Sequence, residues 1–544
     1  MVMYTFARQG QCGRTIFSRT QGGNVKTATD REGHVEDRYN YKVCRNERKS
    51  GVLMHVTSLP SPYGIGTMGD EALEFIDFLV LSGQSYWQIL PLGATGFGDS
   101  PYQSFSSRAG NLYLIDPDEL VRKGLLSEDA PKQFDFGDDP ERVDYGLLWK
   151  NRRNLLCLAW ETFQERSSDS LKQAFATFRK NESDWLQDYA LFMTIKATMN
   201  GAPWRSWPDP LKWRNPVALV EFAESHRHDI LFEQFIQFLF FRQWNRIREY
   251  ASRMGVAIIG DLPIYVADDS VEVWQNPSLF QLDETLTPTY VAGCPPDAFS
   301  DDGQLWGNPL YDWDAHKKQG YEWWIERFRF QMRLYDIVRI DHFRGLESYW
   351  SVPYGDKTAR RGQWIDGPAD SLIEALDEAL GSLPVIAEDL GYMTQEVYEF
   401  RERFGFSGMN VLQFAFNPDA SNDHLPHNLA ENTVLYTGTH DNDTIAAWLA
   451  NADPRELAFA KQYLGLNAEE GYIRGMLRGA ATTVCQTVIF QMQDLLTLGD
   501  ESRMNHPGQA EGNWRWRMLP DKLTLELASS LRELTRMSGR LPSR

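Results

Sequence analysis

The chain has 544 residues, of which 42% are hydrophobic and 24% charged, so it is long enough to bury one large core or two ordinary ones. Its formal net charge of -20 argues against a nucleic-acid or anionic-membrane surface, because polyanions would be repelled on average, and favours a neutral partner. Five widely spaced cysteines with no CxxC pair argue against a disulfide framework and a zinc ribbon, and indicate a reducing compartment.

The first 50 residues differ in composition from the rest. Up to Thr29 they contain four basic residues and no Asp or Glu, with neither helical nor strand periodicity. We expect residues 1–50 to be a disordered N-terminal extension. A transit peptide has this composition, and so would an upstream start codon assigned in error. The expected location is therefore the cytoplasm, or a plastid if the extension is a transit peptide.

Strand-like apolar runs begin at residue 51 and recur along the chain, with helical patterns such as 70–83, 322–334 and 394–405 between them. This alternation predicts a parallel sheet, and eight runs predict an α/β fold of the (β/α)8 TIM-barrel type. A doubly wound open sheet is the alternative, but no GxGxxG or GxxxxGK[ST] motif follows any run. The eight runs are 51–56, 86–92, 256–266, 335–343, 384–391, 409–416, 433–441 and 487–496.

The spacing of these runs is uneven. About 160 residues separate the second from the third, where an ordinary unit needs about 30, so we expect a helical insertion at about 98–250. We expect residues 51–544 to form one catalytic barrel without a separate C-terminal β-domain. The most apolar stretch, 230–244, is interrupted by Glu233, Gln237 and Arg242, and therefore predicts a buried amphipathic helix and no membrane span.

Polar residues stand at the ends of several runs. Active sites of such barrels gather at the C-terminal ends of the strands, so these side chains should meet at one mouth. They are Asp261, Arg339, Asp341, Glu388, Asp389, His440, Asp441, Gln493 and Asp494.

Two of these carboxyl groups suit different chemical roles. Side chains alternate along a strand, so Arg339 and Asp341 share a face, and the guanidinium should keep Asp341 ionised as a nucleophile. Glu388 follows the apolar "PVIA", where burial should raise its pKa. A nucleophile paired with a general acid is glycosidase chemistry.

Carboxylates also gather outside glycosidase sites. A single one is more often part of a structural ion pair or a loop cap, but coincidence at several strand ends favours an active site. A metal site would also use Asp, Glu and His, yet there is no HExxH motif, and "HRH" at 226–228 lies in a polar stretch. We expect neither a metal nor another cofactor.

Six strings in the chain form a recognisable set. They are "GDLPIYVA" (260–267), "GQLWGNPLYDW" (303–313), "RIDHFRG" (339–345), "IAEDLG" (386–391), "YTGTHDND" (436–443) and "MNHPGQAEGNWRWR" (504–517). Together they resemble glycoside hydrolase family 77, the amylomaltases or 4-α-glucanotransferases. The resemblance covers Gly51 to about residue 540 and implies α-retaining transfer of 1,4-α-glucan segments between maltooligosaccharides or starch-type glucans.

The resemblance also implies roles for the strand-end residues. Asp341 matches the family nucleophile, Glu388 the general acid/base, and Asp441 the carboxylate that stabilises the transition state. Arg339 and His440 match residues that orient the nucleophile and the sugar.

Four further residues complete the expected site. Tyr102, in "GDSPYQS", resembles a subsite tyrosine. Trp306 and Asp297 fall in a loop, at about 290–315, that family members fold over the bound glucan. Asp261 is expected behind the site, paired with Arg339.

Two other functions remain open. An α-amylase-like hydrolase shares the barrel and the three carboxylates, but usually carries Asn-His after the third strand, where this chain has Pro263. A noncatalytic glucan-binding protein would be expected to lose Asp341, Glu388 or Asp441, and all three are present. We expect glucans as donor and acceptor, and neither nucleic acid nor membrane as a partner.

Overall fold

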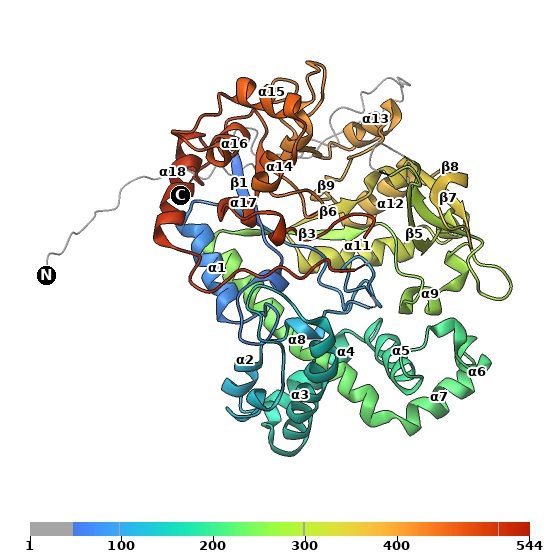
Figure 1. Cartoon of the computed structure of the whole chain (residues 1–544). Coiled ribbons are helices and arrows are strands. Elements are labelled where there is room, and N and C mark those ends of the chain that lie inside the picture. The colour runs from blue at the N-terminus through green and yellow to red at the C-terminus, as the bar shows by residue number, and fades with distance from the viewer. Residues whose placement is uncertain (1–46, 97, 297–299, 510, 544) are drawn as a thin grey trace, which may run out of the picture. The chain divides into compact units, whose positions relative to one another are not determined.

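The computed structural model describes residues 47–96, 98–296, 300–509 and 511–543. Eight parallel strands form one sheet in the order β10-β11-β12-β1-β2-β3-β6-β9. Figure 1 shows β1, β3, β6 and β9 of this sheet among the surrounding helices. A parallel bridge between Ile386 and Ser407 joins β9 to the segment entering β10, so the sheet is a nearly closed barrel. The predicted TIM barrel is confirmed. Most of the predicted disordered extension, residues 1–46, lies outside the described residues.

Each barrel strand overlaps one of the eight predicted runs. Residues at strand centres, such as Val52, Ile258 and Val338, are fully buried, as expected for strands covered on both faces. The first strand begins two residues earlier than predicted. The strands are β1 (Lys49–Leu53), β2 (Tyr86–Gln88), β3 (Ala257–Pro263), β6 (Ile337–Asp341), β9 (Val385–Ala387), β10 (Gly408–Val411), β11 (Thr433–Tyr436) and β12 (Thr487–Gln491).

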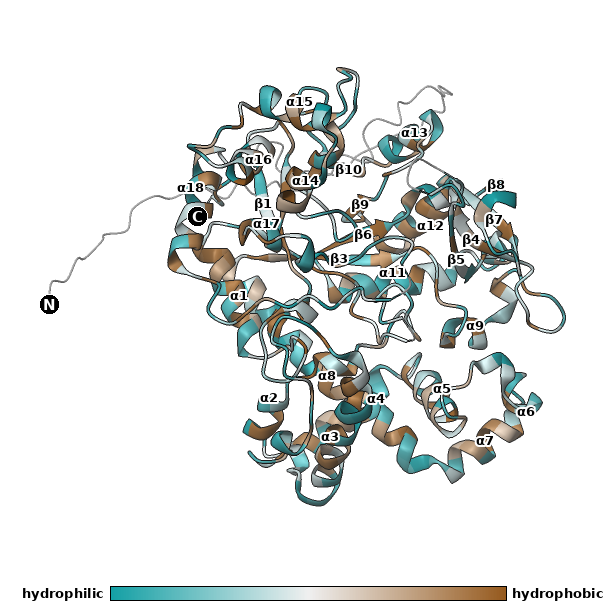
Figure 2. Cartoon of the chain, in the orientation of Figure 1, coloured by the Kyte–Doolittle hydropathy of each residue, from teal (hydrophilic) through white to brown (hydrophobic). Residues whose placement is uncertain are grey.

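Amphipathic helices cover the barrel. In α1 (Asp70–Leu81), Phe75, Ile76 and Leu79 are fully buried on one face, and Figure 2 shows hydrophilic and hydrophobic stretches on the same helix. After β12 the described residues contain helices and no strand, so there is no C-terminal β-domain in that part of the chain. The other covering helices are α11 (Glu322–Leu334), α12 (Asp370–Leu380), α13 (Gln395–Arg403), α14 (Ile445–Asn451), α15 (Pro454–Leu464), α16 (Tyr472–Ala481), α17 (Met492–Leu495) and α18 (Leu525–Met537).

Seven helices lie between β2 and β3 and group at the bottom of Figure 1. The apolar stretch predicted as a buried helix is part of α8, which ends at Gly255 in the left-handed conformation with φ 75°. Its buried Gln237 and Gln243 each bond the N–H and C=O of one backbone residue, Gly110 and Asp116 respectively. The helices are α2 (Pro117–Arg122), α3 (Tyr145–Arg166), α4 (Asp169–Asn181), α5 (Leu186–Thr198), α6 (Asp209–Lys212), α7 (Pro216–Ser225) and α8 (Arg227–Met254). Within the described ranges, no helix has the length and apolar character that crossing a membrane requires.

A small antiparallel sheet, in the order β5-β4-β7-β8, was not predicted. The predicted loop at about 290–315 contains β4, β5 and the start of α10, so much of it is regular structure. The short α9 precedes the sheet along the chain. These elements are α9 (Val271–Gln275), β4 (Tyr290–Cys294), β5 (Gln304–Pro309), α10 (Trp313–Lys318), β7 (Ser348–Pro353) and β8 (Gln363–Asp366).

Candidate active site

Arg339 holds two carboxylates at the mouth of the barrel. Strands β3 and β6 pair with Asp261 opposite Arg339. The Arg339 Nη1 atom lies 2.7 Å from Asp261 Oδ2 and 2.9 Å from Asp341 Oδ1. Arg339 and Asp261 are buried, whereas the side chain of Asp341 is 28% exposed. Asp341 is therefore the carboxylate of this group that faces the mouth.

Glu388 lies beside Asp341. Strands β6 and β9 pair through Ile340 and Ala387, and the next residues are Asp341 and Glu388. The Glu388 N–H donates to the Ile340 carbonyl at 3.0 Å, and Glu388 Oε2 accepts a hydrogen bond from the His342 N–H at 2.7 Å. His342 has a left-handed backbone, φ 53°, at the turn out of the strand.

Burial dominates the electrostatics of both carboxyl groups. It raises the pKa of Asp341 to about 6, although Arg339 acts to lower it. It raises the pKa of Glu388 to about 7, against the lowering effects of Arg339 and the hydrogen bonds from Leu390 and His342. The raised pKa of Glu388 agrees with the expectation from the sequence. For Asp341, the guanidinium alone suggested a low pKa, and burial outweighs it.

At Asp441 the interactions that lower the pKa outweigh the effect of burial, in contrast to Asp341 and Glu388. Burial acts to raise its pKa, but His440 and the hydrogen bonds from His440 and Asn505 lower the pKa to about 2. His440 Nε2 lies 3.3 Å from Asp441 Oδ2, and Asn505 Nδ2 donates to Asp441 Oδ1 at 2.6 Å. Arg503 donates to the Asp441 backbone carbonyl at 2.6 Å. Asp441 is thus ionised across the neutral pH range.

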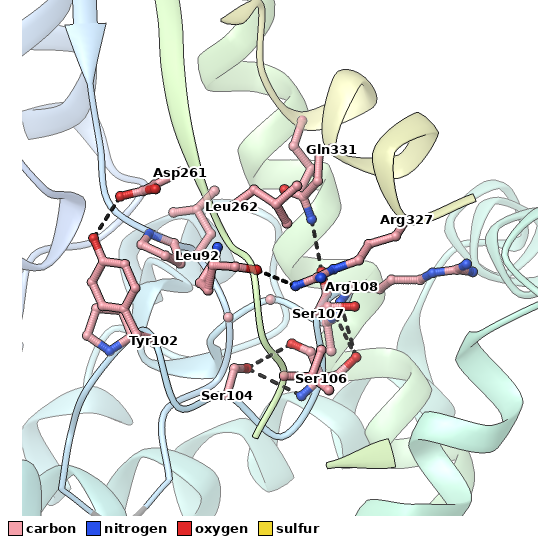
Figure 3. Close-up of a pocket in the computed structure, with 18 of the residues that line it drawn as sticks. Leu92, Tyr102, Ser104, Ser106, Ser107, Arg108, Asp261, Leu262, Arg327 and Gln331 are labelled. Carbon is pink, nitrogen blue, oxygen red and sulfur yellow. Dashed lines mark hydrogen bonds between the residues drawn. The ribbon is translucent and has the colours of Figure 1, made fainter. Parts of the chain in front are cut away.

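Tyr102 contacts both Asp261 and His440. Its hydroxyl donates to Asp261 Oδ2 at 2.7 Å, as Figure 3 shows, and its ring stacks on His440 with centroids 5.2 Å apart and planes at 22°. The Trp514 ring lies 5.8 Å from Tyr102 and 5.7 Å from His440. These contacts place Tyr102, His440 and Trp514 in one aromatic cluster beside Arg339 and Asp261.

A cavity of about 50 Å³ lies behind Tyr102 and Asp261, and Figure 3 shows the side chains around it. It also touches Ser104, Arg327 and Gln331. A water molecule needs about 10–15 Å³, so the cavity has room for a few waters.

Trp306 reaches the mouth from the small sheet. It lies on β5, half-buried, and its ring meets that of His342 edge-on, with centroids 4.8 Å apart and planes at 84°. Trp306 therefore stands next to the residue that follows Asp341. Asp297, expected in the same segment, lies outside the described residues.

Three strand-end residues point to the supporting structure and not to the mouth. Asp389 forms an ion pair with Arg401 and accepts a hydrogen bond from the Met409 N–H at 2.7 Å. Gln493 donates to the Ser502 carbonyl. Asp494 is 1% exposed and bonds the segment that carries His440 and Asp441.

Asn505, Arg503 and Trp514 were not predicted as residues of the site. The signal for two of them was present, because Asn505 and Trp514 lie within the string "MNHPGQAEGNWRWR" that carried part of the family resemblance. In the portion of the chain that the structure describes, no group of three or more His, Cys, Asp or Glu residues could hold a metal ion.

Comparison with known proteins gives one consistent result. The model of the family described as 4-alpha-glucanotransferase matches residues 54–524. A 4-alpha-glucanotransferase of Clostridium butyricum is 48% identical over 489 residues, which cover 90% of this chain and 100% of that protein. The chloroplastic/amyloplastic enzyme of Solanum tuberosum is 43% identical, over 91% of this chain and 87% of that protein.

A solved structure agrees with these sequence matches. The amylomaltase of Streptococcus agalactiae, solved in complex with acarbose, superposes with a TM-score of 0.89 at 43% identity. The match covers 91% of this chain and 100% of that one.

Proposed function

The chain belongs to the 4-α-glucanotransferase family, glycoside hydrolase family 77, and on that basis we propose that Asp341, Glu388 and Asp441 carry its chemistry. It is an enzyme that transfers glycosyl units between α-glucans. The observation that supports the assignment best is the pair of carboxyl groups on neighbouring strands, Asp341 held by Arg339 and Glu388 bonded to the backbone beside it.

The strand pairing favours a retaining mechanism. Neighbouring strands are about 4.8 Å apart, and retaining glycosidases hold their carboxyl groups about 5–5.5 Å apart, whereas inverting enzymes leave about 6.5–9.5 Å for a water molecule. Asp341 and Glu388 follow directly paired residues of β6 and β9. This adjacency suits direct attack by one carboxylate on the anomeric carbon.

The reaction then has two steps. In the first, Asp341 attacks the anomeric carbon while Glu388 gives its proton to the departing glycosidic oxygen, and a covalent glucosyl-enzyme forms. In the second, Glu388 takes the proton of an acceptor 4-hydroxyl, which attacks the same carbon and releases Asp341. A pKa near 7 lets Glu388 serve as acid and then as base.

The surrounding residues support these steps. Asp441, ionised and held by His440 and Asn505, would stabilise positive charge on the sugar in the transition state. Arg339 orients Asp341, and Asp261 in turn holds Arg339. Both carboxylates reach the same guanidinium nitrogen, so Asp261 acts through Arg339.

Three residues are assigned to substrate contacts. Tyr102 would contact sugar from beside His440, and Trp306 from beside His342. We keep Asp297 as a further contact on the strength of the family resemblance. Aromatic rings suit this task because they offer a large apolar face with one polar group.

The proposed substrates are maltooligosaccharides and longer 1,4-α-glucans, as both donor and acceptor. The solved amylomaltase relative was bound to acarbose. We place the enzyme in the cytoplasm, with a plastid as the alternative, because the Solanum tuberosum relative is named chloroplastic/amyloplastic.

Incubation of the purified protein with maltotriose tests this function. We expect glucose together with a ladder of longer maltooligosaccharides, and Asp341→Ala should lose on the order of 10⁴- to 10⁶-fold in rate while its circular dichroism spectrum is unchanged. Accumulation of short sugars alone would indicate a hydrolase, and no change would indicate a binding protein. Unchanged turnover in Asp341→Ala would refute the assignment of the nucleophile.

A further inference from the structure

Two aromatic side chains and one arginine form a surface feature at the rim of the barrel mouth, outside the catalytic group. They are Tyr392, Trp364 and Arg344, which we call the rim platform. The guanidinium carbon of Arg344 lies 3.6 Å from the centroid of the Trp364 ring and 5.5 Å from that of Tyr392. The two rings are nearly parallel, with centroids 6.4 Å apart and planes at 22°.

The platform is fixed from beneath. Arg344 is 4% exposed, donates to the Tyr392 backbone carbonyl, and donates to Ser348 Oγ at 3.2 Å. Trp364 on β8 meets Trp350 on β7 at 5.2 Å, with planes at 65°, and β7 and β8 pair in the small sheet. Arg344 and Trp364 are therefore held in place without any ligand, which reduces the entropy lost on binding.

Tyr392 is 65% exposed, the highest value for a Trp, Tyr or Phe side chain among the described residues. A ring so exposed contributes little to the core. Its backbone carbonyl, and not its side chain, bonds Arg344, so the arrangement of the loop does not depend on the tyrosine ring. The ring is free to contact a ligand.

The position of the platform relates it to the acid/base. Arg344 lies in the turn Phe343–Leu346 directly after β6, the strand that ends in Asp341. Tyr392 follows Glu388 by four residues, which span at most about 14 Å even when extended. Both loops leave the C-terminal ends of their strands, so the platform stands at the same mouth as the catalytic carboxyl groups.

The acid/base side of the mouth is the side of the leaving group and the acceptor. Glu388 must reach the oxygen that departs and, later, the hydroxyl that attacks. A glucan chain that enters as acceptor continues away from this oxygen toward its reducing end. A rigid aromatic surface on the Glu388 loop lies where such a chain can pass.

We propose that Tyr392 and Trp364 form a stacking subsite for the acceptor glucan, beyond the sugar that reacts. The inference rests on the proposed function of Asp341 and Glu388 and adds a determinant of acceptor length. Neutral sugar rings present C–H faces that pack on aromatic faces. An anionic ligand fits less well, because Arg344 is covered by the two rings and the chain carries a net charge of -20.

Acceptor kinetics test the subsite. α-Maltosyl fluoride serves as a fixed donor, and glucose, maltose and maltopentaose serve as acceptors. We expect Tyr392→Ala to lower kcat/KM for maltopentaose by about 3- to 10-fold, the equivalent of one aromatic contact, and to change kcat/KM for glucose less than about twofold. Tyr392→Trp should restore the preference for the long acceptor.

The matched control is Tyr472→Ala. Tyr472 is 40% exposed, lies at the start of α16 and also has a cationic side chain, Lys461, 4.9 Å from its ring centroid. This variant should behave as the unsubstituted enzyme with every acceptor. If Tyr392→Ala transfers normally and keeps the unsubstituted dependence on acceptor length, the rim platform is only structural. If the unsubstituted enzyme transfers to no acceptor, the proposed function itself fails.

Discussion

Asp341 and Glu388 follow paired residues on neighbouring strands, yet their surroundings give the two carboxyl groups different degrees of ionisation. Burial raises the pKa of both, and Arg339 lowers both, but Arg339 touches Asp341 directly at 2.9 Å. Near neutral pH the pair therefore holds about one proton, with Asp341 the more ionised member. One shared proton gives a nucleophile and an acid at once.

An ionised Asp341 beside a protonated Glu388 predicts a bell-shaped pH dependence of kcat/KM with maltotriose. Below about pH 6, protonation of Asp341 removes the nucleophile. Above about pH 7, ionisation of Glu388 removes the proton that the leaving group needs. We expect a narrow maximum between the two limbs, measured from initial rates at constant ionic strength.

A donor whose leaving group departs without a proton distinguishes the acid limb of the pH profile from the alkaline limb. With α-maltosyl fluoride the alkaline limb should disappear from kcat/KM of the donor, because fluoride departs unaided, while the acid limb remains. Glu388→Gln should lose most of its activity toward maltotriose and keep only an initial burst of fluoride release equal to the amount of enzyme, because the second step also needs Glu388 as base. An alkaline limb that persists with the fluoride donor would contradict the role of Glu388 as acid.

The residues of the site differ in how well sequence alone could predict them. The strand-end residues Arg339, Asp341 and Glu388 follow long apolar runs, so their position at the mouth follows from the barrel. Asn505 and Trp514 come from a segment with no strand, and they reach Asp441 and His440 only through tertiary contacts. No periodicity marks such contacts.

At the scale of elements, the small antiparallel sheet was likewise not predictable from local sequence patterns. Its strands are short, such as "QWID", in which no residue is buried, and "YVAGC", in which the three central residues are buried, and segments of this length do not by themselves mark a strand. The pairing of β4 with β7 joins residues far apart in the chain, such as Val291 and Val352. In β5 the exposure alternates over residues 304–307, as expected for a strand.

The segment between β11 and α14 depends on one buried carboxyl group. Asp494 accepts a hydrogen bond from the Thr437 hydroxyl at 2.7 Å and from the Ile445 N–H at 2.6 Å, and these two residues flank His440 and Asp441. Asp494→Ala leaves the Ile445 N–H unpaired, which should cost about 1–3 kcal/mol and lower kcat. Asp494→Asn keeps an acceptor and should preserve most activity.

The pH dependence of stability checks this role of Asp494. Burial raises the pKa of Asp494 from 3.8 to about 7, so the native state binds this proton more tightly than the unfolded state. The contribution of Asp494 is therefore complete at low pH and is lost as the pH rises through about 7. The Tm of Asp494→Asn relative to the unsubstituted protein should rise between about pH 4 and about pH 7. A constant Tm difference would show that the pKa of Asp494 is not perturbed.

For the whole molecule, the barrel was predictable because all eight strands are largely buried on both faces and are rich in apolar residues. From the sequence, the closure between β9 and β10 follows only from the number of strands. No local pattern marks the closure, because it consists of a single bridge between Ile386 and Ser407. The insertion was predictable from spacing alone. Its internal packing depends on pairings such as Gln237 with Gly110, which no local pattern reveals.

The folded barrel begins with the residues at the start of β1. Strand β1 begins at Lys49, whose N–H donates to the Gln486 carbonyl at 2.7 Å and whose carbonyl accepts from Arg540 at 3.0 Å. Arg48 donates to the Ala481 carbonyl at 3.1 Å. A chain that begins at Glu47 keeps all these bonds and should retain full activity and Tm.

A chain that begins at Gly51 loses them. At about 0.5–1.5 kcal/mol for each hydrogen bond, the loss amounts to a few kcal/mol, and the Tm should fall by several degrees. Arg540 is fully buried and would also lose part of its hydrogen bonding, which adds to the cost. Thermal unfolding and maltotriose disproportionation are measured for the two shortened chains. Equal Tm values would show that Arg48 and Lys49 do not contribute to the barrel, and loss of activity in the chain from Glu47 would show that the catalytic unit extends into residues 1–46.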